Sequence, residues 1–423
     1  PLLEAVEGEG QVPAYRGTSY IVFEDLELTD YGNRVPQFAF EVVRRPKPVR
    51  PHVPSAAEAV RAIALMPGTG EYALATSDVT LRNGLFGFGA ANVSAEGGVT
   101  DFTQSLDQAR ETLPNLKSVS LIYSWFGDDL RAGACTCKPK VENNGTDGGM
   151  PWRAGGLTRS EAEELSQIDD RPVYGGTPAD ASVIQAIRAI TQGGQAVTFY
   201  PFLLMEILAG NTLPDPYGAG AQAVLPWRGR ITGDRAPGQP NSTDGTAANR
   251  ASVEAFFGAA QASDFAIQGE FIFYTGPSEW SYSKFILHCA ALCKVAGGVE
   301  AFCIGSEMRG LTQMRDDLGF PAVDKLIELA AQVRLLLPDA KITYAADWSE
   351  YFGYHPQDGS GDVFFHLAPL WADDNIDVIA IDNYMPLTDW RDGTDHADAD
   401  QGPIHALSLL LSGIEGGEGY DWF

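Results

Sequence analysis

Residues 299–310 read Val299-Glu-Ala-Phe-Cys-Ile-Gly-Ser-Glu307-Met-Arg-Gly310. The run 300–304 is short and apolar on both faces, which is typical of a parallel strand that helices cover. Enzymes built on a βα-barrel keep their catalytic groups at the C-terminal ends of the strands, so Glu307 is a candidate functional residue. The structural alternative is that Glu307 caps the next helix or pairs with Arg309 or Arg315.

Strand and helix patterns alternate from residue 55 onward. This order predicts a parallel α/β sheet. No glycine-rich phosphate-binding motif follows an early strand, which favours a (β/α)8 TIM-like barrel over a nucleotide-binding fold. The first strand is expected within 60–65 or 71–75, and the next five at 118–123, 196–200, 300–304, 341–345 and 377–381. Helices are expected at 101–113, 179–191, 282–295, 322–337 and, after the sixth strand, 404–411. We therefore expect the barrel, residues 55–423, to be truncated after about strand six, with its last strands beyond Phe423.

The first 43 residues have a different pattern. Two β-rich runs, 19–23 and 37–43, flank a turn cluster at 30–33 and predict the end of a β-rich domain. Residues 44–54 interleave prolines with basic residues, which is typical of a stiff, extended linker. The sequence thus predicts a domain boundary at this linker.

Composition argues against several classes of partner. The formal net charge is −27, whereas nucleic acids and anionic membranes bind basic surfaces. No apolar run of 18 residues exists, so we expect no membrane insertion. Cys135 and Cys137 lie close together without CxxC spacing or a nearby His, and the three other cysteines fit an apolar core. A metal site at His355, Asp362 and His366 has no fixed spacing, so we expect no metal and no cofactor.

Aromatic and acidic side chains follow three of the predicted strands. Sugars stack their apolar faces on aromatic rings while their hydroxyls bond to carboxylates, so this combination predicts a carbohydrate-facing edge of the barrel. A single ring such as Trp348 is also common in ordinary packing. The residues concerned are Trp125 and Asp128 after the second strand, Asp347 and Trp348 after the fifth, and Asp382 and Tyr384 after the sixth.

Long insertions at 133–174 and 208–249 also fit this edge, because loops of such length are usually functional or disordered. The second insertion contains Trp227 and Arg228, which are candidates to line a glycan groove. The alternative is that Arg228 and Arg230 pair with acidic neighbours and only hold the loop in place.

Glycoside hydrolysis requires two carboxyl groups, one of which acts as the acid. Glu307 is the candidate acid/base. Asp382 and Asp347 are candidate partners, although either residue equally fits orienting Arg228, Arg309 or a sugar hydroxyl. Substrate contacts are thus expected from the residues at the strand ends and in the second insertion.

Four motifs give the chain a resemblance to a known family: 15–25, 30–36, 62–75 and Phe302-Cys-Ile-Gly-Ser-Glu-Met-Arg-Gly-Leu311. With these, the chain resembles the large baseplate ("megatron") tail-hub proteins of tailed phages and gene transfer agents. The resemblance implies a virion protein, made in the bacterial cytoplasm, that joins other tail subunits as a homotrimer. It also implies that the barrel is glycoside-hydrolase-like and opens peptidoglycan or a surface glycan during host cell entry.

The same resemblance assigns roles to single residues. Glu307 matches the acid/base at the end of strand four, and the nucleophile, a glutamate ending strand seven, is expected beyond Phe423. Ser306 stands where many relatives have an Asn that bonds the sugar 2-hydroxyl, and a serine can still donate one hydrogen bond. The alternative function is a catalytically inactive structural or glycan-binding tail protein.

Overall fold

The computed structural model describes residues 21–22, 24, 38–40, 54–83, 87–95, 97–145, 147–388 and 390–416. The chain divides into two compact units, Pro1–Ser55 and Ala56–Phe423. The expected tail-hub segment 1–43 and the linker 44–54 lie almost wholly outside the described residues. No described helix is both long and apolar enough to cross a membrane.

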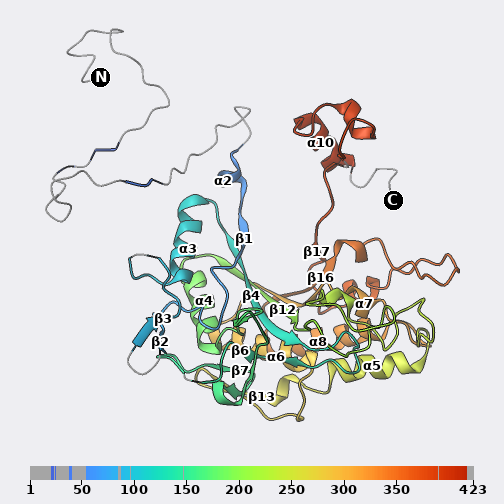
Figure 1. The fold of residues 1–423 in the computed structure, drawn as a ribbon, viewed down its shortest axis with the longest axis horizontal. Coiled ribbons are helices and arrows are strands. Elements are labelled where there is room, and N and C mark those ends of the chain that lie inside the picture. Colours follow the sequence, from blue (N-terminus) through green and yellow to red (C-terminus); the bar gives the residue numbers. More distant parts are fainter. Residues whose placement is uncertain are drawn as a thin grey trace, which may run out of the picture. The chain divides into compact units, whose positions relative to one another are not determined.

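The second unit is built on a parallel sheet whose strands are adjacent in chain order (Figure 1). Each strand pairs in parallel with the strand before it, and helices lie between successive strands. This arrangement is a curled half-barrel, a partial TIM-barrel α/β fold. The strands are β1 (Ala62–Leu65), β4 (Ser118–Gly127), β12 (Ala196–Met205), β15 (Ala301–Ser306), β16 (Lys341–Asp347) and β17 (Ala380–Asp382).

The first strand lies in the earlier of its two expected positions, since residues 71–74 form a turn. Both β4 and β12 extend beyond their predicted ends, to Gly127 and Met205. A short antiparallel strand, β5 (Cys137–Lys138), pairs with the extension of β4 and lengthens the sheet there. The final helix, α10, is shifted toward the C-terminus relative to its prediction and spans Leu407–Gly416.

The main helices begin and end at residues suited to those positions. Ser281 caps α6 by accepting a hydrogen bond from the Lys284 backbone N–H, and Gly297 ends the helix with φ of 110°. Pro321 opens α8, where its missing N–H costs nothing. These helices are α3 (Asp101–Thr112), α4 (Asp180–Gln192), α6 (Tyr282–Ala296), α8 (Pro321–Leu336) and the short α9 (Ala368–Trp371).

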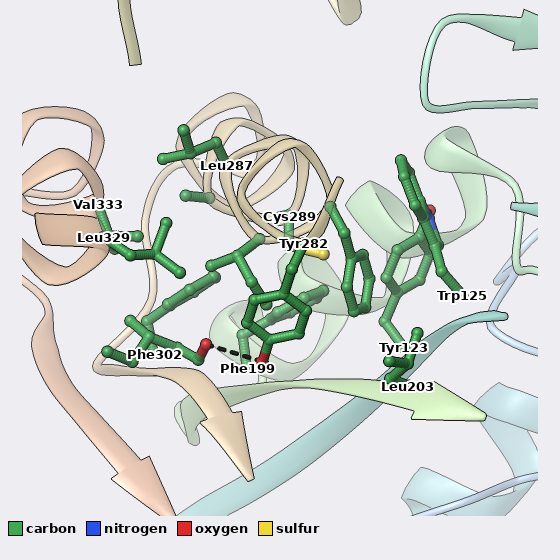
Figure 2. Packing of buried hydrophobic residues seen from close by; sticks show 14 of the residues in the cluster. Tyr123, Trp125, Phe199, Leu203, Tyr282, Leu287, Cys289, Phe302, Leu329 and Val333 are labelled. Carbon is green, nitrogen blue, oxygen red and sulfur yellow. Dashed lines mark hydrogen bonds between the residues drawn. The ribbon is translucent and has the colours of Figure 1, made fainter. Parts of the chain in front are cut away.

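The core lies between the helices and one face of the sheet. In β12, and in β4 as far as Trp125, every second side chain is buried against the helices, and those between are half-buried on the other face. Phe199 and Phe302 stack with ring centroids 5.9 Å apart. Figure 2 labels both among the buried residues of this core, with Tyr282 of α6. The Tyr282 hydroxyl donates to the Ile304 carbonyl at 3.1 Å. A Cβ at Gly305 would lie 2.5 Å from that hydroxyl, so this strand end requires glycine.

Candidate functional site

Three carboxyl groups lie at the ends of consecutive strands. Glu307 follows β15 directly, while Asp347 ends β16 and Asp382 ends β17. Asp347 and Asp382 are register partners, and Ser306 pairs with Ala345 after an irregularity in β15. Since the strands are parallel, the three carboxyls share the C-terminal edge of the sheet. Glu307 and Asp347 are buried, and Asp382 is half-buried.

The backbone of Glu307 has a conformation that few residues other than glycine adopt. Its φ is 52°, in the left-handed region, and its N–H donates to the Ala345 carbonyl at 2.9 Å. The next N–H, of Met308, donates to the Tyr344 hydroxyl at 2.8 Å. A left-handed non-glycine residue costs about 1–3 kcal/mol and persists only where its surroundings fix it. Such residues cluster at functional sites, which strengthens the assignment of Glu307 as one.

Arg228 binds both Glu307 and the residue before it. The Arg228 guanidinium lies 3.0 Å from Glu307 Oε2 and donates to the Ser306 hydroxyl and carbonyl, both at 2.8 Å. The Cζ atom of Arg228 lies 3.7 Å from the centre of the Phe202 ring on β12. Arg228 is almost fully buried, in the short 3-10 helix η3 (Arg228–Arg230). The long loop 208–249 is thereby fixed to the end of β15.

The partners of these residues differ from those considered in the sequence. Glu307 pairs with Arg228, and Arg315 instead pairs with Asp244 and Asp358. Ser306 is buried and its hydroxyl accepts from Arg228, so it holds that arginine.

Two aromatic side chains accompany Glu307. The Trp227 indole N–H donates to Glu307 Oε2 at 2.9 Å, although the Trp227 side chain remains 38% exposed. Tyr384 is well exposed, and the charge of Glu307, followed by burial and the charge of Asp382, raises the pKa of its hydroxyl. The Tyr384 hydroxyl therefore stays protonated at neutral pH. The buried carboxyl of Glu307 is thus flanked by two exposed aromatic rings.

Asp382 accepts a hydrogen bond from the Tyr200 hydroxyl. Burial raises the pKa of Asp382, the charges of Glu307 and Asp347 add to this, and Tyr200 and Arg228 oppose it. Sequence reasoning did not single out Tyr200. The alternation of β12 was the available signal, because it places Tyr200 on the less buried face with Phe202.

Trp125 and Asp128, two predicted substrate contacts, both have partners within the protein. Trp125 is fully buried against α6, where it stacks on Phe285 at 5.0 Å and its indole N–H donates to the Tyr123 hydroxyl. Because β4 continues to Gly127, Trp125 falls on the core-facing side of the strand. Asp128 accepts from the backbone N–H and hydroxyl of Thr136 at 2.7 and 2.6 Å, so it holds the following loop.

The segment after β16 forms a capped turn. Asp347 accepts from the Ser349 N–H at 3.0 Å and caps the 3-10 helix η5 (Trp348–Glu350). Trp348 is half-buried in that turn. Asp347 thus has a local structural role. Its charge also raises the pKa of the neighbouring Asp382.

Behind the site lies a buried polar cluster around Glu350. The Glu350 carboxyl accepts from the Thr312 hydroxyl at 2.6 Å, the Asp347 N–H at 2.8 Å and the Tyr344 hydroxyl at 3.2 Å. Tyr344 in turn accepts from the Met308 N–H. Glu350 therefore supports the backbone that follows Glu307.

This cluster contains two groups whose pKa values are shifted in opposite directions. Burial raises the pKa of Glu350 to about 7, against hydrogen bonds from Thr312, Asp347 and Tyr344 that favour the carboxylate. Burial lowers the pKa of His366 to about 4, and His366 lies 3.3 Å from the Thr312 hydroxyl. Native Glu350 holds its proton up to higher pH than unfolded Glu350, so its contribution to stability is lost as pH rises from about 4.5 to 7. His366 acts oppositely, because the unfolded state binds the proton first, and its contribution grows from about pH 4 to 6.5.

We expect Glu350→Gln to gain stability relative to the wild type as pH rises. The variant lacks the titrating carboxyl, so its free energy of unfolding minus that of the wild type should increase by about 3 kcal/mol between pH 4.5 and 7. Urea unfolding of both proteins at several pH values measures this difference, and subtraction removes the other groups. Parallel curves across this range would contradict the buried, proton-holding carboxyl.

A cavity of about 840 Å³ lies beside the site. Trp227 lines this cavity and also donates to Glu307. Arg230 and Arg309 line it as well, together with the exposed ring of Phe352. The volume is within the range of ligand sites, which is about 300–1,000 Å³.

Residues 280–423 match the family described as the GTA TIM-barrel-like domain. This segment contains α6, β15, Glu307, β16 and β17. The family match and the parallel half-barrel together support a glycosidase-like barrel.

Solved structures of GH113 beta-1,4-mannanase are among the similar folds. One, a complex structure, is 16% identical with a TM-score of 0.34, and the alignment covers 76% of this chain and 63% of that chain. Another is AaManA from Alicyclobacillus acidocaldarius in complex with ManMIm, 17% identical with a TM-score of 0.33, covering 69% of this chain and 58% of that chain. The chain thus spans less than two thirds of these mannanases. A comparison with curated proteins gives no match.

Proposed function

We propose that this protein is a baseplate or tail-tip component of a phage-like particle. In this proposal its barrel binds and cleaves cell-wall peptidoglycan or a surface glycan during DNA delivery. The observation that carries the glycan part is the strand-end carboxyl Glu307, held in a left-handed conformation by buried partners beside an exposed tryptophan. The family match of residues 280–423 supports the particle part.

Glu307 acts as the acid/base in this proposal. Trp227 and Arg228 both bind Oε2, which leaves Oε1 to exchange a proton with the glycosidic oxygen. As the bond from the sugar carbon to that oxygen breaks, Glu307 supplies the proton to the leaving group and a second carboxylate attacks the carbon. Water then cleaves the resulting glycosyl ester, and Glu307 takes the proton of that water, which restores both carboxyl groups. By resemblance that nucleophile is a glutamate at the end of strand seven.

The other groups of the site position the sugar. The exposed ring of Trp227 offers a stacking surface, and the protonated hydroxyl of Tyr384 offers a donor. Asp382, held by Tyr200, is suited to accept a hydrogen bond from a sugar hydroxyl. This division of roles needs no metal and no cofactor.

A catalytically inactive glycan-binding or structural barrel is the second candidate. The ion pair between Glu307 and Arg228 favours it, because such a pair also serves to fix the loop 208–249 at the strand end. Both functions use the same exposed aromatic side chains for adhesion. They differ in whether the glycan is cut.

Incubation of the protein with purified cell walls tests the glycan part. New reducing ends, together with retention of the protein in a wall pull-down, are expected of the hydrolase. Retention without new reducing ends would leave the adhesion function. A protein that is not retained and releases no reducing ends would contradict both functions.

Labelling of purified particles tests the assembly part. An antibody against residues 56–416 is expected to label the tail tip, and mass measurement of the purified protein is expected to give a trimer. Absence of the label from particles would contradict a virion component.

A further inference from the structure

The cavity beside Glu307 is lined by cations and by no carboxylate. Arg230 and Arg309 both line it, whereas none of its lining residues is Asp or Glu. The whole chain carries 56 acidic residues against 29 Lys and Arg. A cavity that excludes acidic side chains in such a protein is an unusual concentration of positive charge.

The two arginines are brought together by a close approach of two segments. Arg309 and Gly310 belong to the short helix α7 (Arg309–Thr312), and Arg230 belongs to η3. A Cβ at Gly310 would lie 2.6 Å from the Ile231 carbonyl oxygen and 2.9 Å from the Tyr217 hydroxyl. Glycine at 310 is therefore what allows α7 to lie against η3.

Neither arginine has an anionic partner in the described part of the chain. The Arg230 guanidinium lies over the Tyr217 ring at 4.2 Å, and its Nε is buried without a hydrogen-bond acceptor. Arg309 is exposed, and neither arginine forms an ion pair among the described residues. Burial raises the pKa of Tyr217 to about 12, Arg230, Arg309 and Thr232 oppose this, and the charge of Asp215 adds to it, so both cations lie near one hydroxyl. An unmatched cation pair of this kind fits an anion of the ligand.

One side chain, Trp227, borders both the cavity and Glu307. Trp227 lines the cavity with its ring and donates its indole N–H to Glu307. A glycan that stacks on Trp227 would therefore lie next to both Glu307 and the cavity.

We propose that this cavity is a subsite for an anionic sugar, one that carries a carboxylate or a phosphate, and that Arg230 and Arg309 bind the anion. The proposal rests on the proposed glycan-binding function and specifies its substrate class. Neutral glycans lack the group that this cation pair binds, so they occupy the subsite more weakly.

Binding of charged and neutral forms of the same glycan tests the proposal. The first pair of ligands is peptide-free peptidoglycan strands with native carboxyls and the same strands with the carboxyls reduced to alcohols. The second pair is a phosphate-bearing oligosaccharide and its dephosphorylated form. Dissociation constants are measured by calorimetry in a Glu307→Gln background, which keeps the glycan intact.

The charged member of one pair is expected to bind about tenfold more tightly, and that pair identifies carboxylate or phosphate as the natural anion. Arg309→Gln and Arg230→Gln should each bring the ratio of charged to neutral affinity close to one. Arg309 is exposed, so its variant keeps the test valid if Arg230→Gln is misfolded. Lys341→Gln removes the same charge at the opposite end of the sheet, at the start of β16, and should retain the preference.

Equal binding of charged and neutral members in both pairs would overturn the proposal. A preference that survives in both arginine variants would do the same. Wild-type protein that shows the preference but releases no reducing ends would support the subsite and contradict only cleavage. Cleavage without any preference for charge would leave the hydrolase and remove the subsite.

Discussion

Replacement of Glu307 by glutamine is expected to lower glycan cleavage by about a thousandfold. General acid–base catalysis contributes about 10²–10⁴ in rate, and the amide cannot exchange a proton with the glycosidic oxygen. The amide oxygen can still accept from Trp227 and Arg228, so binding of intact glycan should be retained. Initial rates of reducing-end release from purified peptidoglycan, compared with pull-down of the same material, measure the two effects separately.

A matched variant separates chemistry from folding. Glu300→Gln makes the same change just before the other end of β15, where Glu300 forms an exposed pair with Lys341, and should leave cleavage unchanged. Thermal unfolding of Glu307→Gln shows whether the protein remains folded when Arg228 loses its anion. A folded Glu307→Gln protein that keeps more than about a tenth of the wild-type rate would exclude Glu307 as the acid/base.

The order of strands and helices followed from sequence because each barrel strand is an apolar run beside an amphipathic helix. The run 300–304 and the helix at 282–295 are both close to their observed positions. The ends of the strands were harder to predict from the sequence. The apolar run at 118–123 does not reveal that β4 continues to Gly127, since pairing with β12 and β5 supplies that extension. The misplacement of Trp125 follows from this one error, because residue 125 lies within the strand and its side chain faces the core.

The candidate site was predicted in part. Glu307 was placed correctly at a strand end, because the apolar run before it fixes where the strand stops. The partner of Glu307 was not determined by sequence, as Arg228 lies 79 positions earlier in a long loop with no periodic pattern. The same holds for Glu350, whose burial depends on Thr312 and Tyr344 from other segments. Local patterns predict elements, whereas such contacts form only when the loops close over the sheet.

Replacement of Arg228 by methionine is expected to destabilise the protein by about 3–5 kcal/mol. The variant keeps an apolar side chain of similar length against Phe202 but leaves the buried Glu307 carboxyl without its cation. Removing one partner of a buried ion pair costs more than the pair contributes, because the remaining charge stays desolvated. Urea unfolding at neutral pH measures the loss. Arg188→Met, which breaks an exposed pair with Glu270, should cost under about 1 kcal/mol.

The double variant Arg228→Met/Glu307→Gln distinguishes an unpaired charge from lost packing. If the unpaired carboxylate causes the loss, removing its charge should recover a large part of it, and the two substitutions should be strongly non-additive. Additive losses would assign the cost to the contacts of Arg228 with Ser306 and Phe202 instead. A loss no larger than that of Arg188→Met would mean that the loop 208–249 does not depend on this pair. Strong coupling would instead make the pair the link between the loop that carries Trp227 and the strand end that carries Glu307, so that stacking surface and carboxyl are positioned together.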